Sequence, residues 1–286
     1  MRKTALLILL SYIVTYSQAQ SISNDLSSDE VPVIFTAGQS NADGRVPIDD
    51  FPSDIRYEYC RWSYGSGDFR VATGDFTPFW PMVAHVTNGQ RWGFDAIVYH
   101  MLEQEWKRPF YVIKQTMGGT AIDYVLQSST HGWYWSADSV ILHSGKSLLK
   151  AFTQQVDDCL SNLPGNYVIK CLLWHQGESD RHRGTHYYDN LRAVIKHVRQ
   201  HLVDVTGDVR YETLPVICGT YAINSKQRSN DVVDALYAIE REDKNFHVVD
   251  ASDLTLLSDS LHFDAQGAQT LGERVFSKLK ELRLTE

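Results

Sequence analysis

The residues Val31-Pro32-Val33-Ile34-Phe35-Thr36-Ala37, followed directly by Gly38-Gln39-Ser40-Asn41, decide the fold of this chain. The first seven are mostly apolar and rich in β-branched side chains, which is typical of a short strand buried on both faces. The glycine ends this strand abruptly and leaves Ser40 on the turn that follows. A serine at such a strand end is a candidate nucleophile, provided that other parts of the chain supply a base and an acid.

Four later apolar runs resemble this first strand, and amphipathic segments separate them. The runs cover residues 109–115, 168–174, 214–219 and 246–250, and apolar side chains recur at helical spacing in about 93–106, 148–163, 185–204, 230–241 and 265–282. Apolar strands that alternate with helices are typical of a parallel sheet covered on both faces. The sequence therefore predicts an α/β fold with three layers (α/β/α, flavodoxin-like) and a mainly parallel sheet of about five strands.

The remaining segments predict the domain organisation. Residues 1–19 carry two early cations, an apolar stretch shorter than the roughly 20 residues that span a bilayer, and a small-x-small cleavage pattern. They predict a signal peptide, followed by a polar leader at 20–30 and a single domain at 31–286. Long loops are expected at about 44–92 and 121–137, where Gly, Pro, Asp and aromatic residues are frequent. We expect a secreted or periplasmic protein with no membrane attachment after cleavage.

The composition narrows the class of partner. The 286 residues carry a formal net charge of −8, which becomes more negative once the two cations of the signal peptide are removed. An acidic chain without a Lys/Arg cluster is a poor partner for nucleic acid or an anionic membrane surface. We therefore expect a neutral substrate and no nucleic acid, and the oligomeric state stays open.

Four cysteines, Cys60, Cys159, Cys171 and Cys218, allow three disulfide pairings in an exported chain. Cys171 and Cys218 lie inside apolar strand-like runs, where a buried free thiol is the simpler interpretation. No CxxC or Cys/His spacing indicates a metal site. We expect no metal and no cofactor.

Three polar blocks supply groups that a serine nucleophile needs. They are Met117-Gly118-Gly119-Thr120, Trp174-His175-Gln176-Gly177-Glu178 and Asp259-Ser260-Leu261-His262. Parallel sheets bind ligands at the carboxyl ends of their strands, which is where Ser40, Gly119 and Gln176 are all expected. Taken alone, each block also fits a tight turn or a helix cap. Their joint occurrence in this order favours a hydrolase.

A serine hydroxyl needs a neighbouring base to take its proton, and His262 is the leading candidate. Asp259, three residues earlier, is placed to accept the other ring N–H and fix the tautomer. The backbone N–H groups of Ser40 and Gly119 and the side-chain amide of Gln176 are candidate donors for an oxyanion hole. Glycine suits this role because no Cβ blocks the approach of a ligand to its backbone.

These blocks resemble the SGNH hydrolase superfamily, and in particular its branch of carbohydrate O-acetylesterases that resemble sialic acid acetylesterases and carbohydrate esterase family six, the acetylxylan esterases. That branch has Gly-Gln-Ser-Asn in the first block, a glycine block next, then Trp-x-Gln-Gly-Glu and finally Asp-x-x-His. The matching residues here are 38–41, 118–120, 174–178 and the pair Asp259 and His262. Phe263 stands where the superfamily often has proline, which affects loop geometry more than chemistry. The resemblance implies an SGNH-type serine esterase.

The resemblance leaves the acid of the triad open between two residues. In some members of the branch, the glutamate that corresponds to Glu178 orients the histidine. We favour Asp259, because an acid three residues from the base is easily held beside it.

Substrate contacts are expected near the blocks and from aromatic side chains in the long loops. Sugar rings present apolar faces that stack on aromatic rings, and core packing is an equal interpretation for each tryptophan. The candidates are Asn41, Asp43, Arg45, Trp62, Trp133, Trp135 and Arg181.

The sequence thus predicts a secreted serine esterase that removes acetyl groups from a carbohydrate. We favour an acetylated plant cell-wall polysaccharide or oligosaccharide, as for an acetylxylan esterase, because the chain is a compact single domain. A sialate O-acetylesterase is the alternative. A non-catalytic carbohydrate-binding protein would lack an intact serine, histidine and acid. A lipase or thioesterase would have more apolar residues after the serine than residues 41–45 provide.

Overall fold

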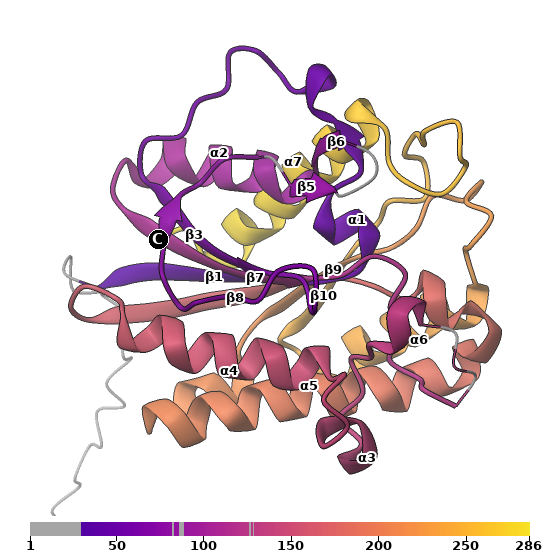
Figure 1. Cartoon of the computed structure of the whole chain (residues 1–286). Coiled ribbons are helices and arrows are strands. Elements are labelled where there is room, and N and C mark those ends of the chain that lie inside the picture. Colours follow the sequence, from indigo (N-terminus) through magenta and orange to yellow (C-terminus); the bar gives the residue numbers. More distant parts are fainter. Residues whose placement is uncertain (1–29, 82, 86–88, 126, 128) are drawn as a thin grey trace, which may run out of the picture.

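The computed structural model describes residues 30–81, 83–85, 89–125, 127 and 129–286. The predicted signal peptide and all but the last residue of the polar leader lie outside these described residues. Helices pack on both faces of a central sheet, so the chain forms three layers (Figure 1). The predicted α/β/α fold is confirmed.

A seven-stranded sheet forms the middle layer, in the order β10-β9-β8-β1-β7-β3-β4. Neighbouring strands run parallel, except for β3 and β4 at one edge. All five predicted strands are present, and β3 and β4 widen the sheet beyond the expected five. The strands are β1 (Val31–Gly38), β3 (Cys60–Gly65), β4 (Thr77–Pro78), β7 (Phe110–Thr116), β8 (Tyr167–His175), β9 (Val216–Gly219) and β10 (Phe246–Val249).

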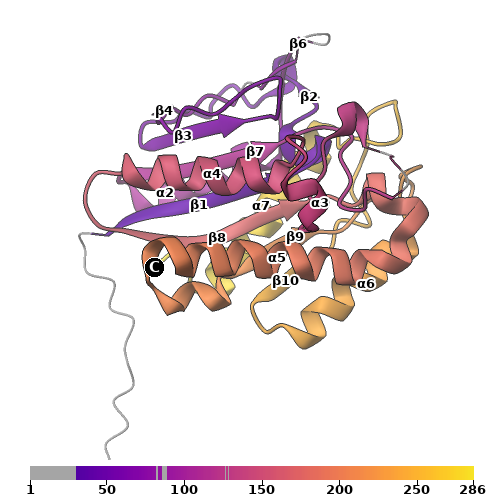
Figure 2. The same cartoon turned by 60° about the horizontal axis from the view of Figure 1, so that its bottom comes forward.

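Each face of the sheet has its own helices and its own apolar core. Helices α2 (Phe94–Trp106) and α7 (Ala265–Glu281) cover one face, and α4 (Leu148–Ser161), α5 (Gly184–Thr206) and α6 (Asn230–Glu242) cover the other (Figures 1 and 2). Side chains of β1 alternate between the cores: Phe35 packs with the α4 side and Ile34 with the α2 side. Burial on both sides explains why the sequence of β1 has no polar face.

The expectation of loops at 44–92 is wrong for part of that segment. Besides β3 and β4, it forms a small antiparallel sheet of β2 (Val46–Pro47), β5 (Val83–His85) and β6 (Gly89–Trp92), and a 3₁₀ turn, η1 (Ile48–Asp50). In β3, Trp62 packs on Phe79 at 5.0 Å between ring centres, while the opposite face meets α4, where Gln155 Nε2 donates to the Ser63 carbonyl at 3.0 Å. A strand near the edge of a sheet needs no continuous apolar run, so its sequence resembles a loop.

Short elements complete the connections. They are α1 (Ser40–Asp43), α3 (Ser139–Leu142), η2 (Thr130–Gly132), η3 (Glu178–Arg183) and η4 (Val209–Thr213). The described residues of the segment 121–137, expected as a loop, form η2 and isolated bridges such as Ala121 with Tyr134.

Three strand ends lie at one level in the middle of the sheet. Gly38 at the end of β1 pairs with Thr116 of β7 and with His175 of β8. The chain first adds strands on the β7 side of β1 and then crosses to the β8 side, so the direction of connection reverses at β1. Ligand crevices of α/β sheets form at such a point. The turns after these three strands therefore share one edge, and Ser40 lies in the central one.

The close approach of β1 to β8 requires a glycine. Gly38 has a φ of +143°, and a Cβ at this position would lie 2.1 Å from the carbonyl oxygen of His175. Any other residue would push the two strand ends apart.

All four cysteines are buried free thiols. None of the three disulfide pairings forms, and the interpretation of Cys171 and Cys218 as buried thiols is confirmed. Among the described residues, no helix combines the length and the apolar character needed to cross a bilayer.

Candidate active site

Ser40 is the first residue of α1, and its turn is fastened to the end of β8. The Gln39 N–H donates to the carbonyl of His175 at 3.0 Å. The Gln39 side-chain oxygen accepts from the N–H groups of Gly177 and Ser179, both at 3.3 Å. Ser40 itself is 5% exposed. The serine therefore lies on a buried turn that hydrogen bonds from Gln39 hold against the end of β8.

His262 and Asp259 form a hydrogen-bonded line with Ser40. The Ser40 hydroxyl lies 3.0 Å from His262 Nε2, and His262 Nδ1 lies 2.6 Å from Asp259 Oδ2. With Nδ1–H donating to the carboxylate, Nε2 is left to accept the hydroxyl proton. This is the arrangement that activates a serine as a nucleophile.

The loop that carries the histidine is closed by its own hydrogen bonds. Asp259 Oδ1 accepts from the N–H groups of Leu261 at 2.9 Å and His262 at 3.0 Å, so one carboxylate fixes both the loop and the ring. The Leu257 N–H donates to the His262 carbonyl at 2.7 Å. Ser260 between them has a φ of +55°, a conformation that tight turns adopt.

The surroundings keep the base neutral and the acid ionised. Burial lowers the pKa of His262 below its usual value, Asp259 opposes this shift, and the nearby cations Arg45 and Lys226 add to it. For Asp259, burial raises the pKa, but hydrogen bonds from the main chain and ring of His262 and from Leu261 outweigh it, so the pKa is lowered. Both pKa shifts favour a neutral histidine and an ionised aspartate, the states that proton transfer from serine requires.

Glu178, the alternative acid, has different partners. It is 1% exposed, and its Oε1 accepts from Asn41 Nδ2 at 2.9 Å. Its Oε1 also lies 3.8 Å from Nε2 of His175. Among the described residues, no hydrogen bond joins Glu178 to His262, so the geometry places Asp259, not Glu178, against the ring.

The glycine block lies beside the serine. A Cβ on Gly118 would be 3.4 Å from the Ser40 Cβ and 2.1 Å from Arg45 Nη2. Gly119 has a φ of +70°, and its carbonyl accepts from the Thr130 N–H at 2.7 Å. Within the described part of the chain, the N–H groups of Ser40 and Gly119 have no hydrogen-bond acceptor. Both predicted backbone donors are therefore available to a ligand.

Gln176 is held by the protein. Its Nε2 donates to Asp180 Oδ2 at 2.6 Å and to the Thr120 carbonyl at 3.0 Å, and it is 3.3 Å from Gln39 Oε1. Its own side-chain oxygen accepts from the Tyr187 hydroxyl at 3.0 Å. In this arrangement the amide braces the strand ends, and its place in an oxyanion hole stays a prediction.

Asp180 is a residue of this site that sequence reasoning missed. It is buried, and besides Gln176 it accepts from the N–H groups of Ile122 at 3.0 Å and Asp123 at 2.8 Å. Burial raises the pKa of its carboxyl to about 6. Asp180 therefore ties the loop after the glycine block to the end of β8. The Gln-x-x-x-Asp spacing after β8 was the only signal for it.

The polar residues predicted to contact substrate divide into two groups. Asp43 is buried, and its carboxylate accepts from Tyr64, Thr116 and Arg45, so it is a structural anchor. Asn41 is also buried and bonded within the protein. Arg45 and Arg181 keep partly exposed side chains, with Arg181 donating to the Glu178 carbonyl at 3.0 Å.

The three predicted tryptophans are packed into the molecule. Trp135 is fully buried and contacts Trp174 at 5.2 Å between ring centres, which makes it a core residue and not a sugar platform. Trp62 is likewise part of a core. Trp133 is 7% exposed, and its indole N–H donates to Asp68 at 3.0 Å. Local sequence could not separate these rings from exposed ones, because burial depends on the tertiary fold.

Phe69 is one of two exposed aromatic side chains among the described large hydrophobic residues, with Trp80, that the sequence did not single out. It is 55% exposed and follows β3 at the carboxyl edge of the sheet. Its ring lies edge-on to His131 at 4.9 Å between centres. His131 follows Thr130, whose N–H binds Gly119. Phe69 therefore contacts the segment whose Thr130 binds Gly119.

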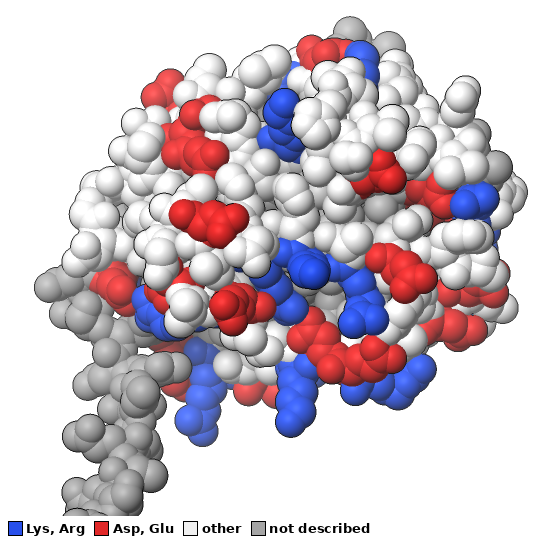
Figure 3. Space-filling model, turned by 90° about the horizontal axis from the view of Figure 1, so that it is seen from below, with Lys and Arg blue, Asp and Glu red and all other residues white. Residues whose placement is uncertain are grey.

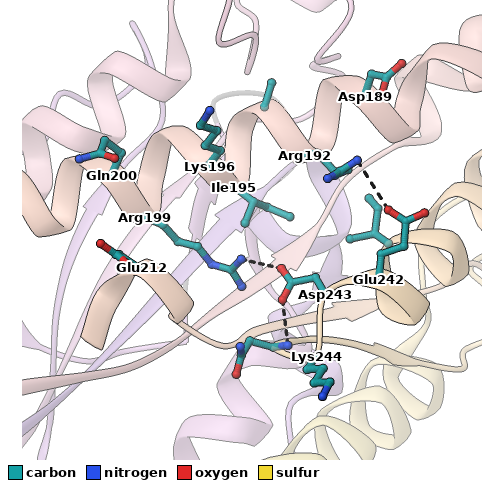
Figure 4. Close-up of a pocket in the computed structure, with 13 residues that line it drawn as sticks. Asp189, Arg192, Ile195, Lys196, Arg199, Gln200, Glu212, Glu242, Asp243 and Lys244 are labelled. Carbon is teal, nitrogen blue, oxygen red and sulfur yellow. Dashed lines mark hydrogen bonds and ion pairs between the residues drawn. The ribbon is translucent and has the colours of Figure 1, made fainter. Parts of the chain in front are cut away.

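A large surface hollow lies away from the serine. It has a volume of about 720 Å³ and lies between α5, η4 and α6. Figure 4 shows Arg199 reaching Asp243, at 2.5 Å, and Arg192 facing Glu242, at 3.6 Å. Lys and Arg lie among Asp and Glu over the described part of the face drawn in Figure 3. Two ion pairs lie among the described residues that line this hollow, and none of those residues belongs to the blocks around Ser40. Among the described residues, no group of three or more His, Cys, Asp or Glu side chains is placed to hold a metal ion.

Comparison with a protein-family profile gives a match over most of the chain. The profile described as "Carbohydrate esterase, sialic acid-specific acetylesterase" matches residues 30–281. No curated protein matches the chain significantly.

Solved structures share the fold. A protein from Arabidopsis thaliana is 20% identical with a TM-score of 0.65, covering 88% of this chain and 98% of its own. NanS is 16% identical with a TM-score of 0.66, covering 90% of this chain and 99% of its own. A carbohydrate acetylesterase from Xanthomonas citri is 15% identical with a TM-score of 0.55, covering 89% and 57%. At these identities the likeness shows the fold alone.

The pH dependence of hydrolysis tests the histidine as the base. We predict that kcat/KM rises from the acid side with an apparent pKa below 6.5, because His262 must be neutral to accept a proton and its pKa is lowered. Asp259→Asn removes the group that raises this pKa, so the acid limb should move lower still. Loss of the fixed tautomer should also reduce kcat by roughly 10³-fold or more.

A pH–rate profile with a nitrophenyl acetate measures both effects. Asp253→Asn is the matched control, because Asp253 binds Arg274 on the surface and has no contact with the triad in the described structure. It should keep the wild-type profile. An acid limb with an apparent pKa at or above 6.5 that does not move in Asp259→Asn would contradict the assignment of His262 as the base and Asp259 as its partner.

Proposed function

The chain belongs to the family of carbohydrate esterases described as sialic acid-specific acetylesterases, and we propose that this carbohydrate O-acetylesterase acts on acetylated plant cell-wall polysaccharides or oligosaccharides through an acyl-enzyme on Ser40. The observation that supports this mechanism is the line from Ser40 through His262 to Asp259, with contacts of 3.0 and 2.6 Å. The enzyme is a carboxylic ester hydrolase of the serine type.

The first step forms the acetyl-enzyme. Ser40 Oγ attacks the acetyl carbonyl carbon while its proton passes to His262 Nε2, and Asp259 stabilises the imidazolium. The negative oxygen of the tetrahedral intermediate accepts hydrogen bonds from the Ser40 and Gly119 N–H groups. Donors of this kind lower a barrier by about 3 to 4 kcal/mol each. His262 then gives its proton to the sugar oxygen, the C–O ester bond breaks, and the deacetylated carbohydrate leaves.

The second step releases acetate by the same groups. A water molecule attacks the acetyl carbon on Ser40, and His262 takes one of its protons. The new tetrahedral intermediate breaks down when His262 returns that proton to Ser40 Oγ. Acetic acid departs and loses its proton to solvent as acetate, and Ser40 and His262 recover their starting states.

Two substrate classes are supported by different observations. We place a cell-wall polysaccharide first because we expect the chain to form a compact single domain. The family description names sialic acid, which favours an O-acetylated sialic acid as the second candidate. With its predicted signal peptide, the enzyme would meet either substrate as a secreted or periplasmic protein.

Phe69 takes the role of sugar platform in this proposal. An exposed ring packed on His131, next to the Thr130 that binds Gly119, can stack on the apolar face of a sugar whose acetyl group reaches Ser40. The buried rings of Trp62 and Trp135 offer no such surface.

Acetate release across a substrate panel tests the function. We predict that the wild-type enzyme releases acetate from acetylated xylan or pectin, and that Ser40→Ala abolishes release from every substrate, because no other group accepts the acetyl. The panel adds sialylated mucin with O-acetyl groups. Release from mucin alone would move the substrate to the sialic acid class, and full activity in Ser40→Ala would overturn the acyl-enzyme mechanism.

Kinetics of Phe69→Ala test the sugar platform. We predict that KM for an acetylated oligosaccharide rises about 3- to 10-fold, the size of one stacking contact, while kinetics with a nitrophenyl acetate change by less than about 2-fold. Val209→Ala, an exposed apolar side chain at the opposite edge of the sheet, is the control. An unchanged KM for the oligosaccharide in Phe69→Ala would rule this platform out.

A further inference from the structure

Asn41, the residue after the nucleophile, contacts the main chain on both sides of the base, His262. Its Nδ2 lies 3.5 Å from the Leu261 carbonyl, and its Oδ1 accepts from the Phe263 N–H at 3.1 Å. Leu261 and Phe263 are the two neighbours of His262. The side chain beside Ser40 therefore contacts the backbone immediately before and immediately after the histidine.

A third contact fixes which way the amide of Asn41 points. Nδ2 also donates to Glu178 Oε1 at 2.9 Å. An amide offers donors at one end and an acceptor at the other, and this set of partners, two acceptors and one N–H donor, fits a single orientation. Turning the amide over would set its oxygen against a carbonyl and a carboxyl oxygen. Glu178 thus selects the orientation in which Asn41 binds both sides of the histidine.

Glu178 is buried at the end of β8 with few other partners. Its Oε2 has no hydrogen-bond partner in the described structure. Its nearest ring, His175, is packed against Phe94, Tyr221 and Phe263, and burial lowers the pKa of that histidine to about 3, so it carries no charge. Burial of a polar side chain with so few partners costs desolvation free energy, so the presence of Glu178 here calls for an explanation.

The carboxyl works in either protonation state. Burial raises the pKa of Glu178 to about 7, and the carboxylate of Asp180 adds to this shift. Both the neutral and the ionised forms keep an oxygen that can accept from Asn41. A glutamine at this position would keep that oxygen too, whereas alanine would not.

We propose that Asn41 and Glu178 are positioning residues for His262: Glu178 orients the amide of Asn41, and Asn41 holds the backbone of the histidine at hydrogen-bonding distance from Ser40. Glu178 then acts on the base through Asn41, without touching its ring. This inference rests on the proposed function, because it assigns a task within the same serine site. It gives Glu178 a task in catalysis although Asp259 already contacts the imidazole.

Three variants separate this role from others. Glu178→Ala should lower kcat for a nitrophenyl acetate by about 10- to 100-fold, the effect of a small misplacement of a catalytic group, with KM within about 2-fold. Glu178→Gln should restore kcat to within about 3-fold of the wild type, because the accepting oxygen remains. Asn41→Ala should lose about as much as Glu178→Ala, and the double alanine variant should lose no more than either alone.

The readout must exclude loss of folded protein. A serine-directed phosphonate counts the competent sites, and kcat is expressed per titrated site. Glu103→Ala is the matched control: Glu103 is a buried carboxylate that accepts main-chain N–H groups of Glu58 and Tyr59 at the amino end of β3, far from the site. It should lower thermal stability and leave kcat per site at the wild-type value.

Two results would overturn the inference. Wild-type kcat per site in Glu178→Ala would show that the contacts of Asn41 with the neighbours of His262 are not needed for catalysis. Should that variant not fold, wild-type kcat per site in Asn41→Ala would show the same. A loss in Glu178→Gln as large as in Asp259→Asn would show that Glu178 acts as an ionised acid on the histidine itself. Both outcomes are distinct from failure of the proposed function, which Ser40→Ala and the acetylated carbohydrates report separately.

Discussion

The parallel register of β1 with its two neighbours is the constraint on which the rest of the structure depends. Gly38 is level with Thr116 on one side and His175 on the other, and its missing Cβ lets β1 and β8 meet within hydrogen-bonding distance. A residue with a side chain would meet the His175 oxygen at 2.1 Å. Because the three strands end together, the turns that follow can bring a serine, a glycine pair and a polar block to one edge.

Buried polar side chains join these turns into one unit. Gln39 accepts hydrogen bonds from main-chain N–H groups after β8. Gln176 connects the end of β8 to the carbonyl of Thr120, after the glycine pair. Asp180 accepts from the N–H of Asp123 in the loop beyond it. Asn41 extends the network to the loop of the histidine. Each of these groups is costly to bury unless its partners are in place, so the network disfavours other arrangements of the same loops. These hydrogen bonds hold the turns around Ser40 in one arrangement.

Much of the fold and the central chemistry could be predicted from sequence because their signals are local. The continuous apolar runs of β1 and β8 indicate strands buried on both faces, and the spacing of Asp259 and His262 brings acid and base together within one turn. The strand β3 could not be recognised, because residues such as Arg61 and Ser63 suit a position next to the edge strand that only the finished sheet defines.

The side chains around the serine were less predictable, because exposure is a tertiary property. Trp135 and Phe69 both lie in segments expected as loops, yet the first is a core residue packed on Trp174 and the second is open to solvent. Asn41 and Asp43 follow the nucleophile in sequence, which suggested contact with substrate. Their hydrogen bonds instead run inward, where they position other groups.

The central claim is that Ser40 carries the acyl group, and covalent labelling tests it most directly. The enzyme is treated with a serine-directed phosphonate until hydrolysis of a nitrophenyl acetate stops, and intact mass and peptide mapping then count and locate the adduct. We predict one adduct per chain, on the peptide that contains Ser40, formed in proportion to the activity lost. Complete inactivation with the adduct on another residue, or full labelling of Ser40 with activity retained, would contradict it.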